Sequence, residues 1–108
     1  MSSSSPSTTC VDKLKLLADP TRLAVLEALM DRPKQVNELL DQLGVEQSLL
    51  SHHLALLREA GMVDSFRKGK AVQYQLGQEV LGTTHGKSLD LGCCQLSFSP
   101  SSRSIKKR

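Results

Sequence analysis

The residues from Glu46 to Val63 constrain the fold more than any other part of the chain. Three leucines recur there at the spacing of one helical face and predict an amphipathic helix over about 47–60: Leu50, Leu54 and Leu57. A second face carries small or hydrogen-bonding side chains: Ser48, Ser51, His52 and Ala55. Gly61 readily adopts the left-handed conformation that ends a helix, and an apolar pair with strand character follows it. A helix that buries one side and presents short polar groups on another suits the major groove of DNA.

Three further amphipathic helices are predicted upstream, because apolar residues recur at helical spacing over residues 10–18, 23–30 and 36–43. Asp19 suits the N-cap of the second helix, and Pro20 suits its first position. A turn around Gly44 separates the third helix from the fourth. Two short helices joined by such a turn predict a helix-turn-helix.

The periodicity changes from that of a helix to that of a strand after Val63. Three residues alternate with more polar neighbours: Val72, Tyr74 and Leu76. A basic turn precedes them and contains Arg67, Lys68 and Lys70. A charged hairpin directly after a helix-turn-helix is typical of a winged helix, in which the hairpin tip contacts the DNA backbone or minor groove.

Positive charge is concentrated around this predicted hairpin. The chain has a net charge of +3, but the four basic residues after Ser102 leave ten basic and eleven acidic groups in the rest. Between Gln47 and Gln75, by contrast, four basic residues face two acidic ones. The excess lies where a phosphate backbone would need it.

The last third of the chain is its least regular part. Its four glycines disfavour a long helix, since each costs about 1 kcal/mol relative to Ala in a helix interior. Apolar residues alternate on both sides of the pair Cys93-Cys94 but in shifted phase, which predicts one bent or bulged strand near 88–98. The sequence therefore predicts a mainly α-helical fold with a small β-hairpin wing and an extra C-terminal strand instead of a long C-terminal helix.

One domain is expected, over residues 10–98. The Ser/Thr-rich residues 1–9 and the basic residues 99–108 are expected to be disordered tails. The core must be aliphatic, because the chain has one Tyr, two Phe and no Trp. A small aliphatic monomer is marginally stable, which favours a homodimer.

Several other classes of protein are disfavoured. No apolar run approaches the ~20 residues that span a bilayer, and the first residues lack the features of a secretory signal, so we expect a cytoplasmic protein without a membrane partner. Three cysteines, an odd number, suit a reducing compartment. The sequence contains no glycine-rich phosphate loop and no nucleophile–base spacing, so it offers no indication of an enzyme. A winged-helix module that binds another protein is the alternative from a different class, and a salt-dependent affinity would favour DNA instead.

The middle of the chain resembles the ArsR/SmtB family of bacterial winged-helix repressors. The similar segments are Leu17–Leu23, Ser48–Leu54 and Leu57–Val63, followed by a wing that ends in Tyr74-Gln75-Leu76. The resemblance covers roughly residues 14–76. It implies a homodimer that binds double-stranded operator DNA at an imperfect inverted repeat and is released by an inducer. No cofactor is expected to be required.

Position by position, the resemblance implies two sets of DNA contacts. The residues that face the groove fall on Gln47, Ser48, Ser51 and His52. The wing contacts fall on Arg67, Lys68 and Lys70.

Two departures from the family bear on the inducer. The helix predicted over 36–43 lacks the cysteine pair that soft-metal sensors of the family carry there. The C-terminal region also lacks the long helix with Asp and His ligands that the zinc-sensing branch uses. The inducer site is therefore expected elsewhere, or it is absent.

The candidate inducer site consists of three cysteines: Cys10, Cys93 and Cys94. Cys10 begins the helix that this family uses for dimerisation, so Cys10 of one subunit could meet the pair of the other, a contact that the sequence alone leaves open. Trivalent arsenic or antimony favours thiolates, and three sulfurs complete a pyramidal site. A thiol redox switch and simple packing without a role remain the alternatives. Zinc with His85 as a further ligand is less favoured, because the spacing resembles no closed zinc module.

The adjacent residues His52 and His53 point about 100° apart on a helix and cannot share a metal ion. His52 is expected to contact the groove or a phosphate. His53 is expected to be a partly buried, hydrogen-bonded residue that supports the turn.

Overall fold

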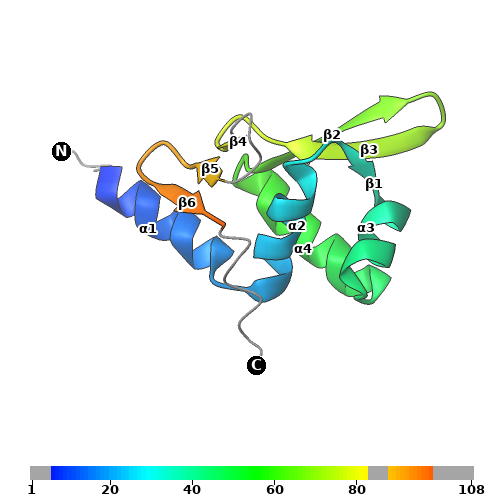
Figure 1. Cartoon of the computed structure of the whole chain (residues 1–108), viewed down its shortest axis with the longest axis horizontal. Coiled ribbons are helices and arrows are strands. Elements are labelled where there is room, and N and C mark those ends of the chain that lie inside the picture. The colour runs from blue at the N-terminus through cyan, green and yellow to red at the C-terminus, as the bar shows by residue number, and fades with distance from the viewer. Residues whose placement is uncertain (1–5, 83–87, 99–108) are drawn as a thin grey trace.

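The computed structural model describes residues 6–82 and 88–98, which form four helices and two small antiparallel sheets (Figure 1). The helices are α1 (Pro6–Leu17), α2 (Pro20–Leu29), α3 (Val36–Leu43) and α4 (Gln47–Glu59). The strands are β1 (Lys34–Gln35), β2 (Val63–Lys68), β3 (Ala71–Leu76), β4 (Leu81–Gly82), β5 (Ser88–Asp90) and β6 (Gln95–Ser97). The prediction of a mainly α-helical winged helix-turn-helix with C-terminal strand structure is confirmed.

The first helix starts earlier than its apolar pattern predicted, at Pro6 rather than Cys10. Proline is favoured in the first turn of a helix, where its missing N–H has no partner to lose. Residues 6–9, which we expected in a disordered tail, are therefore helical. Residues 1–5 and 99–108, the rest of both predicted tails, lie outside the described residues.

Helix α2 lies at the centre of the hydrophobic core and contributes four of its buried side chains: Val25, Leu26, Ala28 and Leu29. Asp19 is its N-cap, as predicted, and one carboxylate oxygen accepts hydrogen bonds from the amides of Thr21 at 2.8 Å and Arg22 at 3.0 Å. The bond from the Arg22 amide contributes most to lowering the pKa of Asp19. The cap fixes where α2 starts and thus how α1 approaches it.

The helix-turn-helix is formed by α3 and α4. Gly44 ends α3 with a φ of 67°, a left-handed conformation that glycine adopts without steric cost, and its amide donates to the Leu40 carbonyl at 2.8 Å. Three leucines of α4 are fully or almost fully buried against the core, as predicted: Leu50, Leu54 and Leu57.

The wing is the β2–β3 hairpin, in which Lys68 pairs with Ala71 across a two-residue turn. Gly69 occupies the first turn position with a φ of 65°, the sign that a two-residue hairpin turn needs there. The strand β1 joins this sheet on the other side of β3, where Lys34 pairs with Tyr74. The sequence analysis missed β1, because two residues are too short for a visible alternation.

The C-terminal region corrects one prediction. A single bent strand near 88–98 is wrong, because β5 and β6 are two antiparallel strands and Leu89 pairs with Leu96. The four residues between them, Leu91 to Cys94, form a turn that we call the cysteine turn. The Leu91 amide closes it by donating to the Cys94 carbonyl at 2.8 Å, and Gly92 has a φ of 90°. The shift in alternation therefore marks a reversal of the chain.

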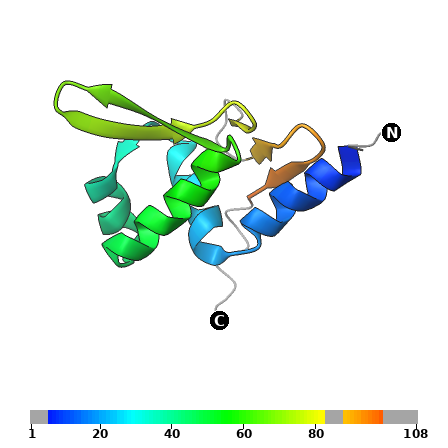
Figure 2. The ribbon, with the colours of Figure 1, turned by 180° about the vertical axis from the view of Figure 1, so that it is seen from behind.

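The helix-turn-helix with its wing lies at the opposite end of the molecule from α1 and the β5–β6 hairpin. Figures 1 and 2 show α3, α4 and the wing at one end, and α1 with β5 and β6 at the other. Helix α2 lies between them and is buried by both. In the described residues, no helix is both long enough and apolar enough to cross a bilayer.

Candidate nucleic-acid interface and cysteine cluster

Helix α4 presents the predicted polar face to solvent. The four residues implied to face a DNA groove are all exposed: Gln47, Ser48, Ser51 and His52. The Ser48 hydroxyl donates to Glu46 at 2.9 Å, just before the helix. The leucines on the opposite face anchor α4, so the polar face is held rigidly outward.

The wing places the three predicted basic residues at its tip. Arg67 and Lys68 end β2, Lys70 lies in the turn, and all three are exposed. Helix α4 leads into the wing through Gly61, whose φ of 78° requires a residue without a Cβ. Exposed polar groups of α4 and exposed cations of the wing therefore flank the same junction.

His53 points away from this surface and is only 6% exposed, so it is more deeply buried than the partly buried, hydrogen-bonded histidine that the sequence predicted. One guanidinium nitrogen of Arg22 lies 3.1 Å from its Nδ1. Because a guanidinium can only donate, Nδ1 is the acceptor in this contact. The Arg22 Nε donates to the carbonyl of Leu16, the penultimate residue of α1. Arg22 thus connects the end of α1 to the recognition helix α4.

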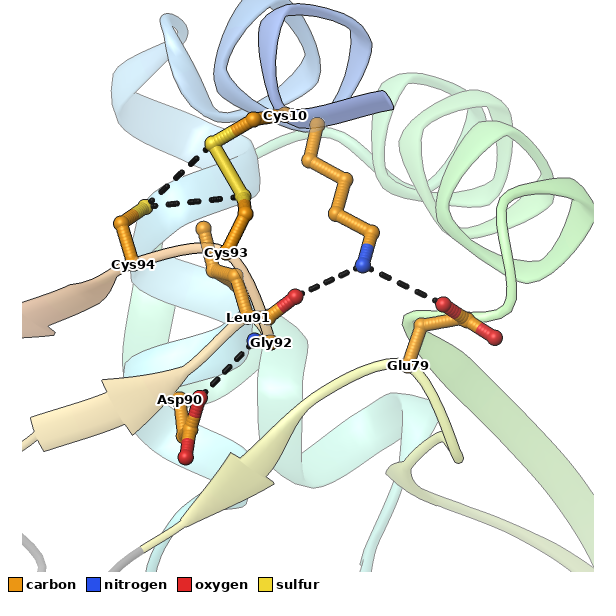
Figure 3. The surroundings of a disulfide bond; sticks show 8 residues. Cys10, Glu79, Asp90, Leu91, Gly92, Cys93 and Cys94 are labelled. Carbon is orange, nitrogen blue, oxygen red and sulfur yellow. Dashed lines mark hydrogen bonds and ion pairs between the residues drawn. A yellow bond between two sulfur atoms is a disulfide. The ribbon is translucent and has the colours of Figure 1, made fainter. Parts of the chain in front are cut away.

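The three cysteines meet within one chain, as Figure 3 shows. Cys10 and Cys93 form a disulfide, and the Cys94 sulfur lies 3.7 Å from that of Cys10 and 4.0 Å from that of Cys93. All three sulfurs lie within 4.8 Å of one another. The sequence left open whether Cys10 meets the pair across a dimer; within this chain, the hairpin β5–β6 folds back onto α1 and brings its turn to Cys10.

The three cysteines of the cluster differ in their exposure to solvent. Cys93 is exposed, whereas Cys10 and Cys94 are half-buried, so a small solute can reach the sulfurs. Three converging sulfurs offer two kinds of chemistry, namely disulfide formation and binding of a soft ion. His85, the further zinc ligand considered from sequence, lies outside the described residues.

Lys13 is a residue that the sequence analysis missed. Its ammonium donates to the Leu91 carbonyl of the cysteine turn at 2.7 Å and pairs with Glu79 at 3.2 Å. Its side chain is only 13% exposed. The signal in the sequence was weak, since Lys13 reads as one more polar residue on an amphipathic helix.

Comparison with known proteins gives a consistent result. A family described as "Bacterial regulatory protein, arsR family" matches residues 19–65. By sequence, the chain is 44% identical over 69 residues to the transcriptional regulator KmtR of Mycobacterium tuberculosis, covering 64% of this chain and 53% of KmtR. The chain spans about half the length of the first relatives that it matches by sequence.

Related solved structures match this chain over a larger share of their own length. Reduced HlyU from Vibrio cholerae superposes with a TM-score of 0.63 and 36% identity, over 74% of this chain and 79% of HlyU. The transcriptional repressor BigR from Xylella fastidiosa superposes with a TM-score of 0.64 and 35% identity, over 67% of this chain and 71% of BigR. Together with the exposed face of α4 and the basic wing, these similarities show that the chain belongs to the ArsR/SmtB family of helix-turn-helix transcriptional regulators, and not to a family of enzymes.

Proposed function

We propose that this protein is a homodimeric repressor that binds operator DNA and is released from it when trivalent arsenic or antimony binds Cys10, Cys93 and Cys94. The observation that carries the choice of inducer is the convergence of three sulfurs within 4.8 Å. A relative described as a transcriptional repressor, BigR, supports repression as the output. Such a protein acts on DNA in the cytoplasm.

In the proposed DNA complex, α4 and the wing make different kinds of contact. In α4, side chains read base edges in the major groove: Gln47, Ser48, Ser51 and His52. At the wing tip, Arg67, Lys68 and Lys70 contact phosphates and contribute affinity for any sequence. Two copies of α4 in a dimer would enter major grooves about 34 Å apart, which matches an imperfect inverted repeat.

The dimer is supported by an apolar strip on α1. Val11 is 47% exposed and Leu14 is 41% exposed, one helical turn apart on the same helix. A chain of 108 residues buries a modest core, and covering this strip with a second copy would add apolar contact.

The metalloid part of the proposal uses the reduced protein. Each of three thiols would replace one hydroxide of arsenous acid, and each thiol proton would leave with that hydroxide as water. The cluster then holds the ion with three sulfurs, the pyramidal coordination that trivalent arsenic accepts. A ligand of this kind shifts DNA affinity only if it favours the state that binds DNA weakly.

A second candidate function is a thiol redox switch, and the disulfide between Cys10 and Cys93 favours it. A peroxide or a small disulfide would accept two electrons from the two thiols and leave them joined. A related structure is described as reduced HlyU, which is consistent with a redox-active relative. In this alternative, Cys94 would remain a free thiol beside the bond.

Equilibrium dialysis of the reduced protein against arsenite, without air, separates the two candidates. The proposal expects about one arsenic per chain and loss of tight binding in Cys94→Ser, which keeps the disulfide pair but removes the third ligand. Cys94→Ser with unchanged arsenite affinity would leave the two-thiol redox function as the better account.

The rival class, a protein-binding module, is tested by fluorescence anisotropy on promoter DNA at increasing salt. Affinity that falls linearly on logarithmic axes supports phosphate contacts. Absence of DNA binding at low salt would contradict the repressor function altogether.

A further inference from the structure

Lys13 contacts two separate segments of the chain, the cysteine turn and the segment that contains Glu79. It lies three residues after Cys10 and therefore on the same side of α1. Its ammonium donates to the Leu91 carbonyl, two residues before Cys93. The cysteine turn is therefore fastened to α1 twice, by the sulfur of Cys93 and by Lys13.

The second contact of Lys13 leads toward the recognition helix. Glu79 lies apart from the cysteine turn in Figure 3, and its carboxylate pairs with the Lys13 ammonium at 3.2 Å. The Glu79 amide donates to the Gly61 carbonyl at 3.0 Å. Its side chain also covers Gly61, since a Cβ placed on Gly61 would stand 2.7 Å from the Glu79 Cγ.

Gly61 is the junction between α4 and the wing. Its amide donates to the Arg58 carbonyl in the last turn of α4, and the next residue, Met62, accepts from the Gly77 amide at 2.7 Å. The packing is close, because a Cβ on Gly77 would stand 2.2 Å from the Gly61 oxygen. Because these segments are closely packed, we expect a displacement of residues 77–80 to move the junction.

We propose that Lys13 is the positioning residue that transmits the state of the cysteine cluster to the junction of α4 and the wing. The proposal rests on the sensing role of the three cysteines. Metal binding or disulfide formation changes where the cysteine turn lies relative to α1. One ammonium contacts both the Leu91 carbonyl and the Glu79 carboxylate, so a shift of the cysteine turn changes the ion pair between Lys13 and Glu79. Because Glu79 contacts Gly61, the position of Gly61 changes as well. The cysteine cluster and the DNA-binding elements therefore both influence the position of residues 77–80 and of Lys13.

The test measures coupling separately from binding. Lys13→Met keeps the aliphatic stem and removes the ammonium, and Lys15→Met removes a charge from an exposed position of the same helix. Each variant is titrated with arsenite alone, with promoter DNA alone, and with both. The coupling factor is the ratio of DNA affinities without and with arsenite, typically about 5- to 150-fold in allosteric proteins.

Lys13→Met is expected to bind arsenite and DNA as the wild type does, but with a coupling factor near one. Lys15→Met is expected to keep the wild-type factor. Wild-type coupling in Lys13→Met, or an equal loss in Lys15→Met, would overturn the assignment. If Lys13→Met does not fold, Glu79→Gln decides in its place: it keeps the side-chain length over Gly61, and reduced coupling is expected.

A second readout separates this inference from the choice of inducer. The amide NMR signals of Gly61 and Met62 are compared between protein reduced with dithiothreitol and protein oxidised with glutathione disulfide. These signals are expected to shift in the wild type and to stay in place in Lys13→Met. If the Gly61 and Met62 signals shift on oxidation but arsenite does not change DNA affinity, the metalloid proposal is contradicted and the role of Lys13 is retained. Signals that stay in place in the wild type would overturn that role.

Discussion

Arg22, in α2, contacts both α1 and α4 through one guanidinium. It donates to the Leu16 carbonyl and to His53, while its own amide is held by the N-cap Asp19. Asp19 also lies 4.0 Å from the other ring nitrogen of His53. The orientation of the recognition helix relative to α1 and α2 is therefore fixed by polar contacts as well as by its leucines.

Replacing Arg22 with Met keeps much of the side-chain volume but removes every donor. The buried His53 nitrogen and the Leu16 carbonyl then lose their partners, and the free energy of unfolding should fall by about 1–3 kcal/mol. Urea unfolding followed by circular dichroism measures this change. A loss below about 0.5 kcal/mol, the range of ordinary surface substitutions, would show that solvent replaces the guanidinium.

Glu38, at the start of α3, gives the fold a defined acid sensitivity. The hydrogen bond from Arg32, at 2.6 Å, and a second from the Gln35 amide lower the pKa of Glu38 from 4.5 to about 2. A carboxyl whose pKa is lower in the folded state than in the unfolded state stabilises the fold above the unfolded value. The contribution is lost as the pH falls from 4.5 toward 2.

Glu38→Gln should therefore flatten the fall in melting temperature between pH 4.5 and 2, because this carboxylate no longer takes up a proton on unfolding. Glu59→Gln, at an exposed carboxylate near the end of α4, is the matched control and should retain the wild-type slope. Thermal melts at half-unit pH intervals measure both. Parallel curves for Glu38→Gln and the wild type would contradict the role of the Arg32 contact.

Among the elements, α4 and the wing are expected to contribute differently to DNA binding. Lys68→Ala should weaken binding to all sequences and reduce the salt slope by about 1. Ser51→Ala should reduce discrimination between promoter and unrelated DNA by about 1 kcal/mol, near the net value of one hydrogen bond, with an unchanged slope. Anisotropy titrations on both DNAs measure these effects. A Lys68→Ala variant with the wild-type salt slope would show that the wing tip does not contact phosphate.

The elements that could be predicted from the sequence are those with a local signal, either repeated apolar spacing or a helix cap. The leucine spacing predicted α4, and Asp19 with Pro20 predicted the start of α2, because burial and capping act locally. The strand β1 pairs through its backbone over two residues and leaves no such pattern. The cysteine turn was interpreted as a bulge, because a shifted alternation fits a bulge and a reversal equally well.

For the whole molecule, the exposed strip on α1 gives the proposed dimer a direct test. Val11→Asp with Leu14→Asp should yield monomers, since two charges would be buried without partners, and promoter affinity should fall with the loss of the second recognition helix. Val72→Asp, at a similarly exposed valine on the wing, is the control for oligomeric state. Sedimentation equilibrium measures the mass. A Val11/Leu14 variant that remains dimeric would place the interface elsewhere.

The candidate site was predictable in composition but not in geometry. The exposed residues of α4 and the wing followed from local pattern and family resemblance. The contact between Cys10 and Cys93 spans 83 residues, and no local pattern encodes a contact of that separation. Lys13 and Glu79 gain their roles only when three distant segments meet, which is why neither was singled out from the sequence.

The most direct test of the central claim is an arsenite titration of the reduced protein bound to labelled promoter DNA, followed by anisotropy without air. The account predicts dissociation at about one arsenic per chain, and no dissociation in a Cys93→Ser/Cys94→Ser variant that still binds the DNA. Anisotropy that stays constant through excess arsenite would contradict metalloid release of the repressor.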